Sequence, residues 1–573
     1  MLDLVKTPMS YKGSYMALAY YKEGQSYHGI VTNPQGDGLY LKSVKGKSRH
    51  CTASLKIIPQ IDGNIEEYEM VYDFHELKLK NNNFEIKICF IDDSKIIIDG
   101  QGKGLSIVLD SLPQSMYDYS FELNDGDESY YVVNSYKTQT KYFISSNNTK
   151  KLHQKYASDM QGTLESKIEI KDNHISLVIQ DIPTHLNKRE KVIYDYEKYS
   201  KDTKKEFEAY ASQFEIPVGK YAHAYKEAIY TTWSCTVKPE GLLARNATYM
   251  SNTFFPGVWS WDNCFNTIGL VGADNQLAYD NMMIVFDFQD EYGQLPGSVN
   301  DSNIHWNFAK PPIHGLFIEK MMKKMSLDNK QYVEIYEKLY KQINYWLTYH
   351  DCNHDGIPEY HHGNDSGYDN STVFINGFVV DSPDLTAYLI RGLETLENIG
   401  EILNKDIQII KSQKEKLIQL FKEHFIINDH IVARDTVTQD VIECDSILPY
   451  VSLIIAKYLP ETLVQKMIKD LKENFVTDYG LATEKTTSIY YDPDGYWRGP
   501  IWAPEMVILI DALEEVGEES FSKDLVERFL DIMTKEGFAE NFNALDGHAL
   551  RDPAHTWTSS SYIYLVNKYN KMQ

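Results

Sequence analysis

The pattern of apolar and polar positions changes once along the chain. From the start to roughly residue 185, short runs rich in β-branched and aromatic residues alternate apolar with polar positions, and turn clusters such as NPQGDG, NNN and NDGD separate them. A period of two interrupted by turns is typical of antiparallel strands. The runs predict strands at residues 14–21, 38–44, 68–80, 84–91, 104–112, 130–135 and 167–182. This part of the chain is therefore expected to form an all-β sandwich.

Beyond about residue 216 the apolar positions repeat at the period of a helix. One stripe passes through Tyr332, Ile335, Leu339, Ile343 and Trp346 in steps of three and four, which places them on one helix face. The pattern predicts twelve helices, at residues 218–236, 261–271, 275–289, 311–325, 328–349, 383–402, 406–424, 445–457, 461–474, 499–517, 519–536 and 556–569. Twelve consecutive helices suit two concentric rings of six, an all-α (α/α)6 toroid barrel, and no repeat of about 34 or 40 residues favours a solenoid.

The change of period also sets the expected domains. Residues 1–188 form the N-terminal β-sandwich domain, and residues 216–573 form the (α/α)6 barrel. Between them, residues 189–215 are rich in Lys, Glu and Tyr and contain no glycine, so they are expected to form a helical linker.

Composition narrows the possible partners. The 573 residues include 57 Lys+Arg and 82 Asp+Glu, a formal net charge of −25, so the chain lacks the positive surface that binds nucleic acid or anionic membranes. No stretch approaches the ~18 apolar residues that span a bilayer, and the start has no apolar run of secretory length. We expect a cytoplasmic protein without nucleic-acid or membrane partners. Its six cysteines lack CxxC spacing and are expected to be reduced, buried thiols rather than disulfides or a zinc site.

The candidate chemistry lies in five long loops between the predicted helices. They cover residues 237–260, 290–310, 350–382, 476–498 and 537–555, and each combines aromatic residues with carboxylates. Long loops in a compact helical domain are usually functional. Indole and phenol rings stack on pyranose rings, while Asp, Asn, Arg and His hydrogen-bond to sugar hydroxyls. The loops therefore indicate a sugar pocket.

Cleavage of a glycosidic bond requires two carboxyl groups, one protonated and one ionised. Asp369 in SGYDNS and Glu540 in FAENFN are the best pair, 540 − 369 = 171 positions apart, although spacing alone does not select them among 82 acidic residues. Whichever of the two is the acid has to stay protonated near neutral pH. Partial burial and the neighbouring Asp365 are expected to raise the pKa of Asp369.

The order of the loop motifs adds a family likeness. PGVWSWDN, KPPIHG, SGYDNS, YWRGPIW and ENFNALDG followed by HTWTSSS, over about residues 250 to 562, resemble glycoside hydrolase family 63 and its bacterial mannosylglycerate and glucosylglycerate hydrolase-like relatives. The resemblance implies a catalytic barrel behind a β-sandwich that hydrolyses α-glycosides with inversion. It implies Asp369 as the general acid and Glu540 as the general base, whose carboxyl groups would stand roughly 6.5–9.5 Å apart.

The loops and the resemblance together give the candidate sugar contacts. These are Trp259, Trp261, Asp262, Trp306, Lys310, Tyr368, Trp497, Arg498 and Trp557. One departure is visible in the acid loop, where Asp365 stands at a position that relatives commonly fill with Glu. The shorter carboxylate leaves the sugar contacts, and hence the specificity, open.

A metal-binding pattern lies just before the acid loop. Asp351, Asn353 and Asp355 alternate and a glycine follows, as in the first half of an EF-hand loop, but the twelfth position is His362 instead of Glu, which excludes a true EF-hand. Two interpretations stay open: an Asx-rich turn, or a calcium ion bound by Asp351, Asn353, Asp355 and the carbonyl of Ile357, with Glu359 or a distant carboxylate completing the shell. The resemblance supports a structural calcium, and the chemistry itself is expected to require no cofactor.

Two rival functions remain. Such barrels also host sugar epimerases and isomerases with histidine bases, for which the candidates are His305, His314, His361, His362 and His555. A non-catalytic carbohydrate-binding barrel is less favoured, because both candidate carboxylates are present. The favoured function is an exo-acting inverting α-glycosidase, of α-glucosidase or α-mannosidase type, acting on a small soluble α-glycoside. The sugar, its aglycone and the oligomeric state are not set by the sequence.

Overall fold

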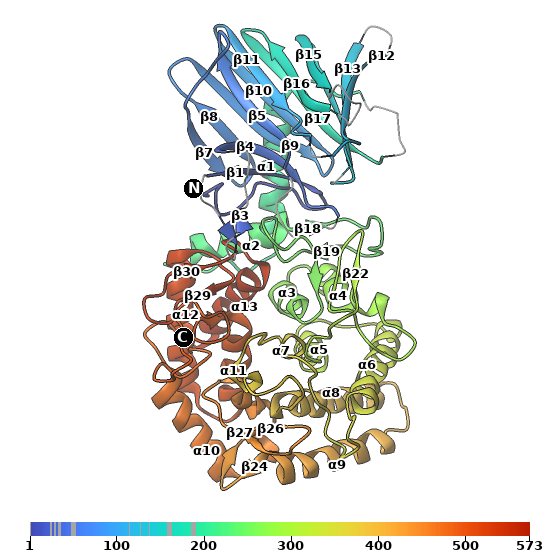
Figure 1. Cartoon of the computed structure of the whole chain (residues 1–573), viewed down its shortest axis with the longest axis vertical. Helices are drawn as coiled ribbons and strands as arrows, with labels where there is room; N and C mark the ends of the chain where they lie inside the picture. The colour runs from blue at the N-terminus through green and yellow to red at the C-terminus, as the bar shows by residue number, and fades with distance from the viewer. Residues whose placement is uncertain are drawn as a thin grey trace.

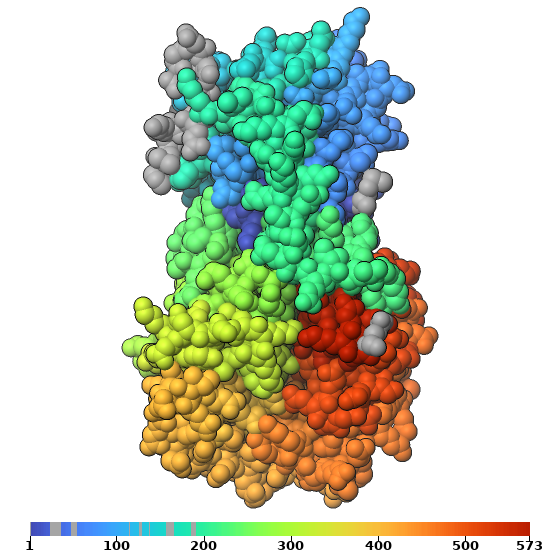
Figure 2. All heavy atoms as spheres, turned by 180° about the vertical axis from the view of Figure 1, so that it is seen from behind, coloured from blue at the N-terminus to red at the C-terminus, as the bar shows by residue number. Residues whose placement is uncertain are grey.

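The structure, a computed structural model, stacks a β-domain on a helical barrel along the long axis of the molecule (Figure 1). It describes residues 2–22, 26–27, 30–31, 36–46, 53–113, 115–125, 128–136, 138–156, 163–184 and 191–572. The predicted boundary at residues 188–189 lies outside the described residues. Helix α1 (Tyr196–Ala211) follows it, and the chain around this helix runs from the β-domain down onto the barrel, as the view from behind shows (Figure 2).

Two large antiparallel sheets form the β-domain, together with a small strand pair, β2 (Ser26–Tyr27) and β3 (Ile30–Val31). One sheet has the strand order β1-β4-β5-β11-β16-β15, with β6 paired to β5, and the other has the order β12-β13-β14-β17-β10-β9-β8-β7. The strands are β1 (Met16–Tyr21), β4 (Gly38–Ser43), β5 (Ala53–Ile61), β6 (Asn64–Ile65), β7 (Glu69–Asp73), β8 (Glu76–Lys80), β9 (Phe84–Asp92), β10 (Lys95–Gly102), β11 (Leu105–Asp110), β12 (Tyr119–Asp125), β13 (Glu128–Ser135), β14 (Thr140–Ser146), β15 (Thr149–Tyr156), β16 (Thr163–Lys171) and β17 (His174–Ile182).

Strand β10 shows why some strands have no alternating pattern of apolar and polar residues. Ile96 and Ile98 point into the core between the sheets, whereas Ile97 packs on the outer face with Cys89 and Tyr196 of α1. Helix α1 therefore covers the outer face of the second sheet, and β10 is apolar on both faces. The sandwich fold is as predicted, but strands such as β5, β10 and β12 lie outside the expected runs.

Six inner helices close into a ring in the second domain. They are α3 (Asp262–Leu270), α5 (His314–Met322), α8 (Pro383–Ile402), the 3-10 segment η3 (Leu448–Tyr458), α11 (Ala503–Glu515) and α13 (Thr556–Met572), and each packs against the next, with α13 returning to α3. Six helices surround them: α2 (Ala222–Ser234), α4 (Asn275–Met283), α6 (Asn329–Tyr349), α9 (Gln408–Phe425), α10 (Glu461–Asp470) and α12 (Glu519–Glu536). The predicted (α/α)6 barrel is confirmed.

The two domains share one hydrophobic core that runs from the sandwich into the barrel. Polar contacts reinforce the junction. The buried Lys42 of β4 donates to the carbonyls of Asn252 and Thr253, and Lys45 pairs with Asp181 of the sandwich and Glu240 of the barrel at 3.0 and 2.8 Å. The β-domain is thus fastened to a barrel loop that leads to the site described below.

The structure also bears on the expected membrane spans and cysteines. Among the described residues, no helix is both long enough and apolar enough to cross a membrane. The thiols of Cys89, Cys235 and Cys264 are buried as expected, but Cys352 is exposed and Cys444 is half-buried. The expectation of burial is therefore wrong for Cys352, which lies in a surface loop, and Cys51 lies outside the described residues.

Candidate active site

A cavity of about 500 Å³ opens at the end of the barrel where the inner helices begin. Its walls come from the segments that lead into α3, α5, α8, α11 and α13. Eight predicted residues line it: Trp259, Trp261, Asp262, Lys310, Asp369, Trp497, Glu540 and Trp557. Hollows of about 620 and 950 Å³ lie elsewhere, but their described walls contain no tryptophan. Of these three cavities, the one between the loops has the character of a sugar site.

Asp369 lies in a turn that depends on a glycine. The short helix α7 (Gly363–Ser366) ends at Gly367, whose φ of +79° is left-handed. A Cβ atom on Gly367 would stand 2.6 Å from the Trp261 ring, so only glycine lets the turn lie against that ring. The Asp369 side chain is 31% exposed, and Lys310 Nζ lies 3.1 Å from its Oδ1.

The surroundings favour the protonated form of Asp369. Desolvation raises the pKa of this carboxyl above its usual range, while the cation of Lys310 acts in the opposite direction without cancelling the effect. The hydroxyl of Tyr496 also hydrogen-bonds to Asp369. A carboxyl group with a raised pKa can hold the proton that a leaving group requires.

Glu540 lies on the opposite loop, immediately before β29 (Asn541–Phe542), and is 2% exposed. Its backbone N–H donates to the Asp552 carbonyl at 2.7 Å, and the Asp552 N–H donates to Glu540 Oε2 at 3.3 Å. The buried Asp552 carboxylate accepts hydrogen bonds from the hydroxyls of Ser251 and Thr253 and from the Phe254 N–H. Asp552 therefore ties the Glu540 loop to the loop that carries the first aromatic residues of the wall.

Asp262 is the first residue of α3 and is 6% exposed. Its Oδ2 has no hydrogen-bond partner among the described residues, although buried polar atoms are nearly always paired. Burial raises the pKa of Asp262 to about 7, Lys310 lowers it and the nearby Asp369 raises it further. An unpaired carboxyl oxygen on the cavity wall is suited to a sugar hydroxyl.

Lys310 holds the acid loop in place. Its Nζ donates to the carbonyl and the side-chain oxygen of Asn364, at 2.8 and 2.6 Å, as well as to Asp369. Asp365 fixes the same loop from behind, because its carboxylate accepts the N–H groups of Ala309 and His361. The Asp at this position thus anchors the loops and does not line the cavity.

The aromatic wall is packed rigidly. Trp497 stacks on Trp502 with ring centroids 4.0 Å apart and an interplanar angle of 6°. Trp261 meets Trp557 edge to face at 5.8 Å and lies 6.1 Å from Trp497. Because each ring is supported by another, the wall offers fixed faces to a sugar ring.

Three predicted sugar contacts do not line the cavity. Tyr368 is fully buried behind Trp497, with its ring centroid 4.2 Å from that ring. The Arg498 Nε donates to the Asn370 carbonyl at 2.6 Å. Trp306 follows β22 (Ile304–His305) and is half-buried outside the cavity. Tyr368 and Arg498 therefore lie where they support the wall and the acid loop, and not where a sugar would touch them.

Several lining residues are not among the predicted sugar contacts or the carboxyl pair, although two of them are candidate histidine bases: Phe254, Phe255, Phe308, His362, Asn364, Gly367, Tyr496 and His555. Gly367, Tyr496 and His555 lie within the quoted motifs, and the other five lie within four residues of one. Tyr496 has a positive φ of +65°, and the Arg551 guanidinium lies 5.0 Å from its ring centroid. The sequence shows the motif. It does not show which of two adjacent residues a left-handed backbone conformation directs toward the cavity.

Comparison with known proteins identifies the family. The model of the mannosylglycerate hydrolase MGH1-like glycoside hydrolase domain matches residues 255–558, more than half of the chain. The chain belongs to this family. The MGH1-like match covers four of the five loops, the end of the first loop and all eight predicted lining residues, and the recognition of glycoside hydrolase family 63 is confirmed.

Individual relatives of this glycoside hydrolase are distant. A mannosylglycerate hydrolase from Thermus thermophilus is 26% identical over 86 residues, which is 15% of this chain and 21% of that protein. The crystal structure of a family 63 mannosylglycerate hydrolase from the same species, in complex with Tris and D-glycerate, gives a TM-score of 0.54 at 16% identity, over 60% of this chain and 100% of that one. The family 92 glycosyl hydrolase ccman5 gives 0.58 at 10% identity, over 99% and 85%.

The cavity contains two of the five histidines that the rival function would use as bases. Of the five candidates, His362 and His555 line the cavity, whereas His305, His314 and His361 do not. Burial lowers the pKa of His555 to about 3. Such a ring stays neutral but is a weak base, so the cavity offers carboxyl groups as the stronger candidates.

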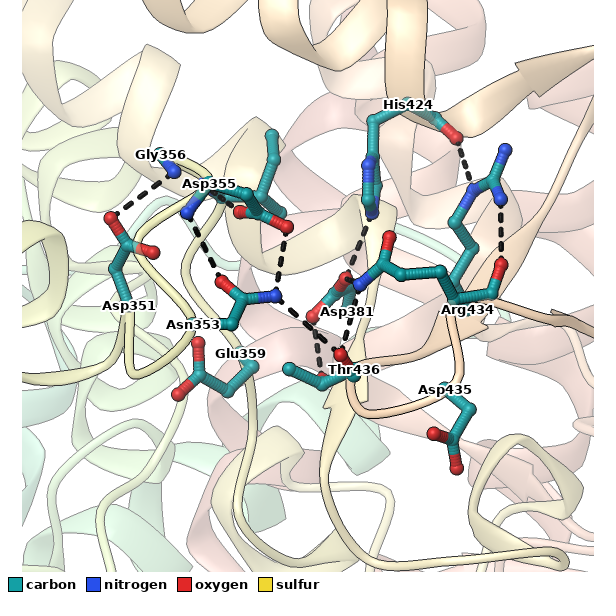
Figure 3. Close-up of polar contacts among 12 residues, drawn as sticks. Asp351, Asn353, Asp355, Gly356, Glu359, Asp381, His424, Arg434, Asp435 and Thr436 are labelled. Carbon is teal, nitrogen blue, oxygen red and sulfur yellow. Dashed lines mark hydrogen bonds and ion pairs between the residues drawn. The ribbon is translucent and has the colours of Figure 1, made fainter.

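The Asp351 loop contains two successive Asx turns, at Asn353 and Asp355, closed by a longer hydrogen bond to Asp351 (Figure 3). Asp351 Oδ2 accepts the Gly356 N–H, Asn353 Oδ1 accepts the Asp355 N–H and Asp355 Oδ1 accepts the Ile357 N–H. Asp351 Oδ1 is buried without a hydrogen-bond partner among the described residues. This orphaned oxygen and the other hard oxygen donors fit calcium, and calcium binding at this loop stays a prediction.

Proposed function

We propose that the protein is an exo-acting inverting α-glycosidase that hydrolyses a small soluble α-glycoside. One observation carries the proposal: two carboxyl groups, those of Asp369 and Glu540, line the same cavity beside an aromatic wall. The two residues are 171 positions apart in the sequence. Membership of a glycoside hydrolase family supports hydrolysis of a glycosidic bond. The pair of carboxyl groups supports general acid and general base catalysis.

In the proposed reaction Asp369 is the general acid and Glu540 is the general base. The protonated Asp369 donates its proton to the glycosidic oxygen as the bond from that oxygen to the anomeric carbon breaks. The Glu540 carboxylate removes a proton from a water molecule, whose oxygen attacks the anomeric carbon from the opposite face. The products are the free aglycone and a sugar with inverted, β configuration, and later proton exchange with solvent restores both carboxyl groups.

Asp262, Trp261 and Trp497 would hold the sugar during this step. The unpaired Oδ2 of Asp262 would accept a sugar hydroxyl, and the tryptophan faces would bind the apolar side of the ring. Asp351, Asn353, Asp355 and the Ile357 carbonyl would hold a calcium ion, which would stabilise the loop and take no part in bond cleavage.

For the aglycone we propose a neutral group. Lys310 is the only lysine or arginine among the described lining residues, and Asn364 and Asp369 already occupy its ammonium group. Arg498 is turned to the Asn370 carbonyl. A glycerate carboxylate, as in the substrate named for the T. thermophilus relative, would therefore lack a free permanent cation in the described wall.

The test is a panel of α-linked disaccharides, mannosylglycerate, glucosylglycerate and free sugars, with products followed by proton NMR. We expect the first-formed sugar to be the β anomer and hydrolysis to fall at least 1,000-fold in Asp369→Asn and Glu540→Gln. The matched control is Asp546→Asn, an exposed carboxylate on the Glu540 loop, which should retain wild-type activity. Conversion of a free sugar, or full activity in both variants, would refute the proposal.

A second substrate separates the two roles. The fluoride of an α-glycosyl fluoride leaves without protonation, so a missing general acid matters little for it, whereas a missing general base still matters. We expect Asp369→Asn to hydrolyse the fluoride at close to the wild-type rate. The Glu540→Gln variant should remain nearly as slow on the fluoride as on the other glycosides. The reverse pattern would exchange the roles of the two residues.

A further inference from the structure

Outside the cavity, three side chains with three different ligand atoms converge in the turn before the acid loop. Cys352 Sγ lies 3.7 Å from His361 Nε2, and His361 Nε2 lies 3.3 Å from Glu359 Oε1. All three ligand atoms lie within 4.8 Å of one another. None of these residues lines the cavity.

The spacing of these atoms matches the edges of a tetrahedral zinc site. Zinc bonds of about 2.3 Å to sulfur and about 2.0–2.1 Å to nitrogen or oxygen, at tetrahedral angles, separate S from N by about 3.5 Å and N from O by about 3.3 Å. The structure has 3.7 and 3.3 Å for these two edges. Cys352 and His361 are exposed, which leaves a side of the cluster open to a water ligand.

The backbone holds the three residues in this arrangement. The Cys352 N–H donates to both carboxylate oxygens of Glu359, at 3.0 and 3.3 Å, and the Glu359 N–H donates to the His350 carbonyl at 2.6 Å. The His361 N–H donates to Asp365, and its ring stacks on His350 at 4.4 Å. Because these contacts already order the three residues, an ion that binds them would cost little further conformational entropy.

The charge balance of the cluster also favours a cation. Glu359 is 0% exposed, and its ion-pair partner among the described residues is His361, which is charged only when protonated. A buried carboxylate without a permanent positive partner is unfavourable. A bound divalent ion would supply the missing positive charge beside Glu359, whether or not His361 is protonated.

A second group of potential ligands lies nearby, and its buried carboxylate already has side-chain hydrogen-bond partners. It consists of Asp355, Asp381 and His424 (Figure 3). The buried Asp381 accepts hydrogen bonds from Thr436 at 2.6 Å and from His424 at 2.8 Å. The Glu359 carboxylate points away from this group in Figure 3, so the two clusters are separate, and only the first contains sulfur.

We propose that Cys352, Glu359 and His361 bind a zinc-class transition-metal ion, with water as the fourth ligand, and that the ion fastens the turn that leads into the acid loop. This proposal does not depend on the glycosidase function. Binding converts the Cys352 thiol to a thiolate, and a second proton leaves where His361 is protonated; both protons pass to the buffer. Cysteine spacing could not predict the site, because the other two ligands are Glu and His.

The test uses cobalt(II) and zinc(II) on the reduced full-length protein, stripped of metal with a chelator and then dialysed. Excess calcium is present throughout, to occupy any site made only of oxygen ligands. We expect one equivalent of cobalt to give a thiolate-to-cobalt charge-transfer band together with the visible bands of tetrahedral cobalt, and zinc to abolish both. Zinc should also raise the melting temperature of the wild type.

Four variants make the test specific. Cys352→Ser should abolish the charge-transfer band and remove the zinc-dependent rise in melting temperature, and His361→Gln should weaken cobalt binding at least tenfold. The control Cys444→Ser, which removes another incompletely buried thiol, and His424→Gln should behave as the wild type. A wild type without the charge-transfer band, or a Cys352→Ser variant that retains it, would overturn the proposal. So would binding lost only in His424→Gln, since it would place the metal at the second group.

Discussion

Asp262 holds a carboxyl group where ionisation is unfavourable. Burial raises its pKa to about 7 from a usual 3.8. Below pH 4 the group is protonated in both the folded and the unfolded chain. Between pH 4 and 7 the unfolded chain loses the proton while the folded chain keeps it, so the free energy of unfolding falls as the pH rises. The loss reaches a plateau on the order of 4 kcal/mol above pH 7.

The Asp262→Asn variant tests this linkage. Asparagine cannot ionise, so we expect the melting temperature of the variant to exceed that of the wild type by an amount that grows from pH 5 to pH 7 and then levels off. Activity should fall at least 100-fold, because the carboxyl group that would accept a sugar hydroxyl is lost. Calorimetry at pH 5, 6, 7 and 8 with steady-state kinetics measures both effects. The exposed Asp546→Asn control should show neither, and an advantage that shrinks as the pH rises would contradict the assignment.

At the scale of single residues, the sequence predicts only in part which residues line the cavity and which lie behind them. Asp369 and Trp497 line the cavity, but the adjacent Tyr368 and Arg498 do not. The difference depends on backbone turns such as those at Gly367 and Tyr496, whose φ angles are +79° and +65°. Glycine makes the first turn foreseeable, whereas a left-handed tyrosine follows no local rule.

At the scale of elements, Asp552 joins two loops. Its carboxylate accepts hydrogen bonds from Ser251, Thr253 and Phe254, while its backbone pairs with Glu540 in both directions. The aromatic wall and the candidate base are therefore held by one buried residue. A change at Asp552 should move both at once.

For Asp552→Asn we expect a loss of about 2–4 kcal/mol in stability and a fall in kcat of at least tenfold. The amide can replace only one acceptor oxygen, so at least one buried donor of the Ser251 loop loses its partner. Thermal melting gives the first effect and single-turnover kinetics the second. Asp546→Asn is again the matched control, because it removes a carboxylate from the same loop in an exposed position. Wild-type kcat in a destabilised Asp552→Asn protein would show that the residue supports folding alone.

Elements differ in how well periodicity predicts them. Amphipathic helices such as α6 follow from their apolar stripe, because one face is buried and the other is exposed. Strand β10 does not alternate, since both of its faces are covered. The meeting of five loops around one cavity follows from closure of the inner ring, a long-range property that no local pattern contains. Motif order and family resemblance supplied that information instead.

At the scale of the whole molecule, the sequence predicts two domains but not how they meet. Lys42 lies in the middle of a sandwich strand, where an alternating pattern would turn a lysine toward solvent. In the structure it is 1% exposed and donates to the carbonyls of Asn252 and Thr253. Phe254 and Phe255, which follow directly in the chain, line the cavity. The β-domain thus supports the aromatic wall through one buried cation.

The Lys42→Met variant tests that coupling between the domains. Methionine fills a similar volume but donates no hydrogen bond, so two buried carbonyls lose their partner, at a cost of about 2–4 kcal/mol. We expect a lower melting temperature and a KM raised at least fivefold with a smaller change in kcat, because the displaced phenylalanine rings line the cavity and carry no group for proton transfer. The control Lys78→Met replaces a sandwich lysine that is 34% exposed and pairs with Glu76, and it should leave KM unchanged. An unchanged KM in a destabilised Lys42→Met protein would mean that the sandwich supports folding of the barrel without shaping its cavity.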